Sequence, residues 1–175
     1  MLNSETRPQT ILLPVKPLFI AFTLAAAFMI NLLPWSGWLL AIKPDFVALV
    51  LLHWCILQPR RVGFTVAMLF GVAMDVADGS LFGQHALAYS MLAFAGIVLH
   101  RRVLSFTMKD QILHVIPLLL LNDLIVLLIR KFAGGEFPGI LYFFGSIIAG
   151  ALWMPLCYLL KRPDRKSTRL NSSHT

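Results

Sequence analysis

Of the chain's 175 residues, 58% are apolar, and the mean hydropathy is +0.79. Soluble domains carry about 45–50% apolar residues, so this composition excludes an ordinary water-soluble fold and indicates an integral membrane protein. The formal net charge of +7 does not indicate nucleic-acid binding, because the Lys and Arg residues form short clusters between apolar runs, as topology-determining residues do.

Six apolar segments are predicted to cross the membrane as α-helices, separated by short polar turns. A helix rises about 1.5 Å per residue, so about 20 residues span a hydrocarbon core of about 30 Å. Pro34 is expected to end the first helix, with Trp35 and Trp38 at the level of the lipid head groups. The segments are expected at residues 17–33, 46–57, 62–76, 84–99, 112–129 and 139–160.

These segments predict an all-α integral membrane protein, with six transmembrane helices in one compact bundle at residues 17–162. Residues 1–16 form a polar N-terminal tail. Residues 163–175 change abruptly to a polar composition without an apolar period and are expected to be disordered. The end of this tail looks foreign to the native sequence, so we give it no functional weight.

Basic residues are distributed unevenly between the two sides of the predicted bundle, which indicates its orientation. The outer loops would hold only Lys43, Arg130 and Lys131. The Arg130–Lys131 pair is the one place that does not fit an excess of basic residues on the inner side. The excess on the other side favours an N- and a C-terminus that are both cytoplasmic. The inner turns would either anchor to anionic lipids or meet a cytoplasmic partner with an acidic surface. They contain Pro59, Arg60, Arg61, Arg101 and Arg102.

Four polar side chains are predicted to lie at one depth, in the outer half of the membrane. Ionisable groups at such a depth cost about 2.5–3.5 kcal/mol each, so they usually face the protein interior or water. Three interpretations remain open: hydrogen bonds between helices, a ligand or proton pathway, and docking of a partner's transmembrane helix. We name the four residues the intramembrane polar layer, which consists of Asn31, His53, Asp75 and Asp123.

Small residues recur at every fourth position through the third segment and the loop that follows it. Positions four apart share a helix face, and small residues there let another backbone approach closely. The expected partner is another helix of the chain, such as the first or the sixth, or a second chain, which would give a homodimer. We name this set the small-residue stripe, interrupted by one acid: Gly63, Ala67, Gly71, Asp75, Gly79 and Gly83.

The sequence contains no pattern that indicates catalysis, a metal site or a cofactor. Metal-binding spacings such as H-E-x-x-H and C-x-x-C are absent, and there is no P-loop. Asp75 and Asp123 lack the Tyr-Asp and Gly-x-Gly-Asp contexts of intramembrane aspartyl proteases. Cys55 and Cys157 lie in apolar runs and are expected to be apolar filler. We therefore predict a protein that is not an enzyme and has no cofactor.

An ordered set of motifs resembles the bacterial rod shape-determining protein MreD family, over about residues 17–162. His53 stands where an aromatic residue is common in that family, so the resemblance does not imply an essential role for it. The motifs are the Lys43-Pro44 entry to the second segment, the run from Asp45 to Trp54, Pro59-Arg60-Arg61-Val62, Gly71-x-x-x-Asp75-x-x-x-Gly79-Ser80-Leu81-Phe82-Gly83, and the intramembrane acid Asp123.

The resemblance implies a multi-pass protein of the bacterial inner membrane without catalytic activity, which acts in the cell-elongation machinery and in peptidoglycan synthesis. Its implied partners are the bitopic protein MreC and, indirectly, MreB, RodA and the elongation transpeptidase. The implied fold is similar to the six-helix substrate-binding subunits of energy-coupling-factor transporters. That likeness leaves open a small-molecule-binding subunit of a transporter, which would have a polar cavity around the intramembrane polar layer.

Overall fold

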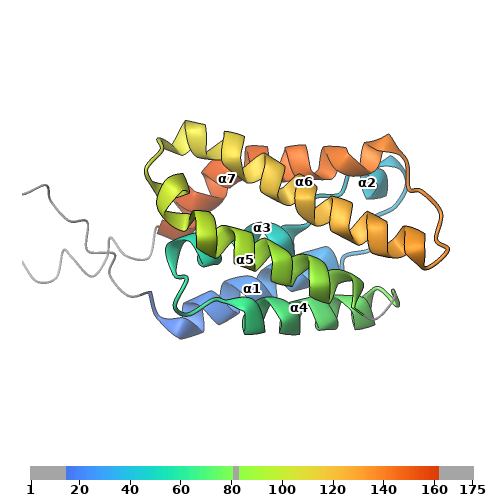
Figure 1. Ribbon diagram of the computed structural model, residues 1–175, viewed down its shortest axis with the longest axis horizontal. Coiled ribbons are helices and arrows are strands. Elements are labelled where there is room, and N and C mark those ends of the chain that lie inside the picture. Colours follow the sequence, from blue (N-terminus) through green and yellow to red (C-terminus); the bar gives the residue numbers. More distant parts are fainter. Residues whose placement is uncertain (1–14, 81–82, 162–175) are drawn as a thin grey trace, which may run out of the picture.

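The computed structural model describes residues 15–80 and 83–161, and within them it contains only helices, turns and loops. Six helices of 12 or more residues form the body of the protein, with two short helices in the connections (Figure 1). The helices are α1 (Pro17–Asn31), α2 (Trp38–Ala41), α3 (Phe46–Leu57), α4 (Phe64–Ala77), α5 (Gln84–Leu104), α6 (Met108–Phe132), the 3-10 helix η1 (Ile140–Phe143) and α7 (Phe144–Lys161).

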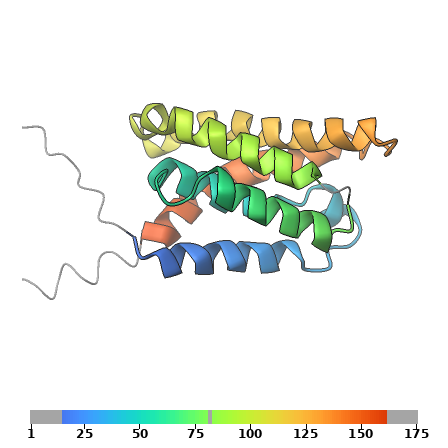
Figure 2. The ribbon, with the colours of Figure 1, turned by 60° about the horizontal axis from the view of Figure 1, so that its bottom comes forward.

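The long helices alternate in direction, so their connections gather at two opposite ends of the bundle (Figures 1 and 2). The tight turns α3–α4 and α5–α6 lie at one end, where the described chain also begins and ends. The connections α1–α3, α4–α5 and α6–α7 lie at the other end, which we name the loop end. The predicted bundle of six helices is therefore present, and its helices run alternately up and down.

Several helices extend beyond the expected apolar segments. Helix α5 runs to Leu104 rather than to residue 99, and α6 covers Met108–Phe132 rather than 112–129. The expected bounds were placed before the basic residues, whereas Arg101 and Arg102 lie in the last turn of α5. Positive side chains there interact favourably with the helix dipole, so the helix continues through them.

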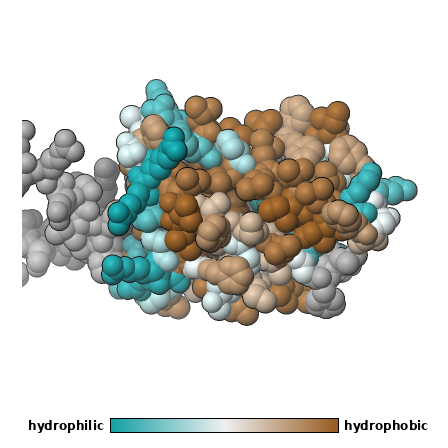
Figure 3. All heavy atoms as spheres, viewed as in Figure 1, coloured by the Kyte–Doolittle hydropathy of each residue, from teal (hydrophilic) through white to brown (hydrophobic). Residues whose placement is uncertain are grey.

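The described helices suit a bilayer in length and composition. Four apolar helical stretches are long enough to cross one: Trp38–Leu57, Gln84–Leu104, Met108–Phe132 and Ile140–Leu160. Two further apolar helices, Pro17–Asn31 and Phe64–Ala77, are shorter, with 15 and 14 residues. Apolar side chains form a belt between two polar ends (Figure 3), as expected for a protein surrounded by lipid.

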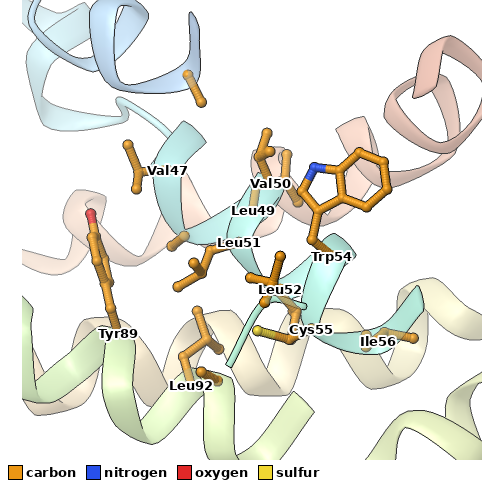
Figure 4. Close-up of a cluster of buried hydrophobic side chains, with 14 of the residues drawn as sticks. Val47, Leu49, Val50, Leu51, Leu52, Trp54, Cys55, Ile56, Tyr89 and Leu92 are labelled. Atoms are coloured by element: carbon orange, nitrogen blue, oxygen red, sulfur yellow. The ribbon is translucent and has the colours of Figure 1, made fainter. Parts of the chain in front are cut away.

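Helix α3 is the centre of the fold. Every residue from Val47 to Ile56 is buried, and the helix packs against α1, α5 and α7. A helix that is apolar on all sides is typical of a position inside a bundle. Tyr89 and Leu92 of α5 point toward α3 (Figure 4). Helices α1, α5, α6 and α7 thus pack against α3, whose first residues lie at the loop end.

Candidate functional site

The small-residue stripe makes its close contact at Gly71, where α4 meets α5. A Cβ atom at Gly71 would lie 2.6 Å from both the Ala86 nitrogen and the His85 carbonyl oxygen. Ala67, one turn earlier, is fully buried. The partner of the stripe is therefore α5, and the expectation of the first or the sixth helix is wrong. The short α4–α5 connection brings these two helices together as a hairpin.

The outer members of the stripe do not pack against another helix. Gly63 precedes α4, and a Cβ atom there would meet nothing within 4 Å. Gly79 and Gly83 lie in the α4–α5 connection with φ angles of 58° and 100°, which favour glycine over residues with a side chain. The four-residue recurrence continues past the end of α4 because the turn also needs glycine. The predicted packing face is thus limited to Ala67, Gly71 and the buried Asp75.

The second face of small residues, on α7, also makes close contacts. A Cβ atom at Gly145 would lie 2.5 Å from the carbonyl oxygen of Lys43, and one at Gly150 would overlap the side chain of Ile116 on α6. Ala149 between them is 1% exposed. These small residues therefore let α7 approach the Lys43 backbone and α6 closely.

Asp75 closes the α4–α5 hairpin by capping the start of α5. Its carboxylate accepts hydrogen bonds from the backbone nitrogens of Gly83 and His85, both at 2.8 Å, and of Ala86 at 3.3 Å. The His85 Nδ1 atom lies 2.9 Å away, and the Ser80 hydroxyl donates at 3.2 Å. A carboxylate is favourable at a helix N-terminus, where backbone N–H groups lack partners. Asp75 is thus a structural cap.

Asp45 is the polar centre of the α1–α3 connection. Its carboxylate accepts hydrogen bonds from the Asn31 amide at 2.9 Å, the Ala48 nitrogen at 3.0 Å and the Tyr89 hydroxyl at 2.7 Å. The Asn31 side chain also accepts from the Phe46 nitrogen, and Asn31 is 3% exposed. Sequence reasoning did not assign Asp45 to a site. The signal was present, since aspartate before an apolar helix is a common N-cap.

Tyr89→Phe is expected to lower the free energy of unfolding by about 1.5 kcal/mol, because it removes a hydrogen bond to a charged acceptor. Tyr89 is fully buried, so the phenyl ring should keep its packing. Unfolding in mixed micelles with increasing denaturing detergent would measure the change. The control is Tyr158→Phe, at a side chain that is 73% exposed. Equal stabilities of the two variants would contradict the assigned Tyr89–Asp45 bond.

The remaining members of the intramembrane polar layer join helices in different places. Asp123 of α6 accepts a hydrogen bond from Ser146 of α7. His53 of α3 lies with its Nδ1 atom 3.5 Å from the Cys157 sulfur of α7, and its ring packs edge-on against Trp153 at 5.5 Å between centroids. Cys55 and Cys157 are both buried.

A cavity of about 940 Å³ opens at the loop end, between its three connections. Asn31 and Asp123 line it, and Asp75 lies beside it because its partners Ser80 and His85 are lining residues. His53 is not a lining residue. It follows Phe46 by seven residues on α3, about 10 Å along the axis. The predicted layer is therefore gathered around the cavity except for His53.

The basic residues at the opposite end are accessible. The described part of the chain shows all four arginines of the tight turns as exposed: Arg60, Arg61, Arg101 and Arg102. The described residues contain no group of three His, Cys, Asp or Glu side chains placed to hold a metal ion.

Comparison with known proteins identifies the family. The model of the family "rod shape-determining protein MreD" matches residues 14–162. The chain belongs to the MreD family. The rod shape-determining protein MreD of Haemophilus influenzae is 31% identical over 145 residues, which are 83% of this chain and 89% of that protein. No solved structure matches the chain.

Membership of the MreD family supports a role in the determination of rod shape. The family is one of shape-determining structural proteins and is not known as a family of enzymes. Together with the four apolar helical stretches that can cross a bilayer, it identifies this MreD-family chain as an integral membrane protein.

Proposed function

We propose that this MreD-family chain is a non-catalytic inner-membrane scaffold of the cell-elongation machinery that binds MreC. Through MreC it would act with MreB, RodA and the elongation transpeptidase in peptidoglycan synthesis. Support comes from the family match, which extends over nearly the whole helical region, from residue 14 to residue 162. The polar side chains described above support a structural role, because they bond one helix to the next.

We further propose six membrane spans with both termini in the cytoplasm. In support, the exposed Arg60–Arg61 and Arg101–Arg102 pairs lie at the end where the described chain begins and ends, as the positive-inside rule requires. Helices α1 and α4 would be accommodated by locally thinned lipid. The arginine turns would then face anionic lipids or MreB.

The surface that meets MreC would lie outside the small-residue stripe. Gly71 is covered by α5 of the same chain, so the stripe is not free to receive a partner helix. For the same reason the stripe gives no support to a homodimer. A single-span partner would instead pack on the outer apolar surface, where Phe22 of α1 and Leu69 of α4 are 70% and 65% exposed.

Affinity recovery from mildly solubilised membranes would test the scaffold. We expect a single-span MreC protein to co-purify with the tagged chain, and not with an equally abundant tagged membrane protein of unrelated function. Depletion of the chain should also convert rod-shaped cells to round ones. Recovery without any single-span partner, together with unchanged cell shape, would reject the proposal.

A small-molecule-binding subunit of a transporter remains a second candidate, and the cavity at the loop end favours it. This candidate predicts a polar cavity around the intramembrane polar layer, and Asn31 and Asp123 do line one. The same affinity recovery separates the two functions. A transporter subunit of the energy-coupling-factor type would co-purify with nucleotide-hydrolysing chains instead of MreC.

A further inference from the structure

The cavity at the loop end has the size of a ligand site and lies at the edge of the apolar belt. Its volume of about 940 Å³ falls within the usual range of about 300–1,000 Å³ for small-molecule sites. Residues from the α1–α3, α4–α5 and α6–α7 connections form its walls. Polar residues border the apolar belt at its two ends (Figure 3), so in a bilayer a cavity at the loop end would open near the lipid head groups.

One part of the cavity wall is acidic. Asp45 and Asp123 both line the cavity. Lys43 also lines it, but its ammonium group already donates to the Asn31 carbonyl oxygen at 2.6 Å. Two carboxylates at one cavity repel each other, and a cation bound there relieves that repulsion. This part of the wall is therefore suited to a positively charged group.

A buried amide on the wall points independently to a ligand. The Gln84 side chain is 5% exposed and lines the cavity, yet it makes no hydrogen bond to any described residue. Its amide oxygen and nitrogen are not among the fully buried unpaired atoms of the described residues, so they are open to the cavity. The amide of Gln84 can donate to an anionic oxygen or accept from an ammonium group.

Arg130 supplies a positive charge at the mouth of the same cavity. It is exposed and lines the cavity, and its side chain makes no hydrogen bond or ion pair within residues 15–80 and 83–161. It follows Asp123 by seven residues on α6, so the two share a face about 10 Å apart along the axis. Lys131, the next residue, does not line the cavity. The two basic residues that do not fit the positive-inside rule therefore differ, because only Arg130 belongs to the cavity.

We propose that this cavity binds a small zwitterionic group. Its ammonium would lie against Asp45 and Asp123, its phosphate or carboxylate would lie against Arg130, and Gln84 would bond to either part. Two sources offer this chemistry: the head group of a phosphatidylethanolamine in the surrounding leaflet, and a free zwitterion such as ethanolamine phosphate. Binding here goes beyond the scaffold role and does not depend on MreC.

The experiment uses the full chain, purified in detergent and freed of lipid. Thermal unfolding is measured with ethanolamine phosphate, and in nanodiscs of phosphatidylethanolamine or of phosphatidylcholine, whose trimethylated ammonium has no N–H donor. We expect one of the two ethanolamine probes to raise the melting temperature, and phosphatidylcholine to have less effect. Arg130→Gln should weaken the apparent affinity for that probe by about tenfold, through loss of a charge-assisted bond. Lys131→Gln is the matched control and should change it by less than about twofold.

The outcomes distinguish the two sources of the ligand, the lipid head group and a free zwitterion. Stabilisation by phosphatidylethanolamine alone identifies the head group, and stabilisation by ethanolamine phosphate identifies a free ligand. The inference is overturned if neither probe stabilises the chain, if phosphatidylcholine acts equally well, or if Arg130→Gln and Lys131→Gln behave alike. Arg130 is the decisive position because its side chain makes no hydrogen bond to a described residue, so its replacement should leave folding intact.

Discussion

Gly71→Ala is expected to destabilise the protein by about 3 kcal/mol, the upper part of the range for overpacking in a tight interior. The new Cβ atom would lie 2.6 Å from the Ala86 nitrogen and the His85 carbonyl oxygen. These are backbone atoms, so α4 and α5 would have to separate, whereas a side chain could simply rotate away. Thermal unfolding of the purified chain in detergent would measure the loss.

Gly63→Ala is the matched control, because it adds the same methyl group to the same stripe. A Cβ atom at Gly63 would meet nothing within 4 Å, and its φ of −130° is open to alanine. We expect its melting temperature to stay close to that of the unchanged chain. If the two variants had the same melting temperature, close packing of α4 on α5 could not be the role of Gly71.

Features that depend on neighbouring residues were predictable from the sequence. Helix α3 was predicted at residues 46–57, and the structure places it at Phe46–Leu57. Asp45 caps its start, and Pro59 follows its end by two residues. Each of these signals lies within or beside the segment itself, so no knowledge of the tertiary fold was needed.

Features that depend on rotation about a helix axis were not predictable. Counting residues gives the depth of a side chain in the membrane, but not the direction in which it points. His53 was assigned to the layer of Asn31, although it lies about 10 Å along α3 from Phe46 and faces Cys157 and Trp153. The stripe was paired with the wrong helix for the same reason, since the hairpin packing of α4 and α5 decides what covers Gly71.

The cavity depends on three connections that are far apart in the sequence. Asn31, Gln84 and Asp123 come together only when the α1–α3, α4–α5 and α6–α7 connections meet at one end. The Tyr89–Asp45 hydrogen bond likewise joins residues 44 positions apart. Sequence periodicity reports the face of a single helix and does not show such a meeting. The one local sign was the Arg130–Lys131 pair, because the positive-inside rule does not account for basic residues at this end of the bundle.

Asp75→Leu is expected to destabilise the protein by about 4 kcal/mol, because a buried donor left without an acceptor costs about 1–3 kcal/mol. The leucine would leave the backbone N–H groups of Gly83, His85 and Ala86 without their acceptor, and it would also remove the bond to the His85 ring. Water from the adjoining cavity would satisfy some of these groups, so the loss should stay below the sum of the separate bonds. Amide hydrogen exchange should increase most in the first turn of α5.

Asp75→Asn tests how much of the capping effect depends on the negative charge of the carboxylate. The amide keeps one acceptor oxygen but turns an NH₂ group toward backbone donors, so we expect about half the loss of the leucine variant. Asp78→Asn is the matched control, since Asp78 is exposed and its side chain bonds to no described residue. Fast exchange confined to the start of α5 in both Asp75 variants, and absent from Asp78→Asn, would establish the cap. Uniform exchange across all three proteins would instead show that α5 starts without help from Asp75.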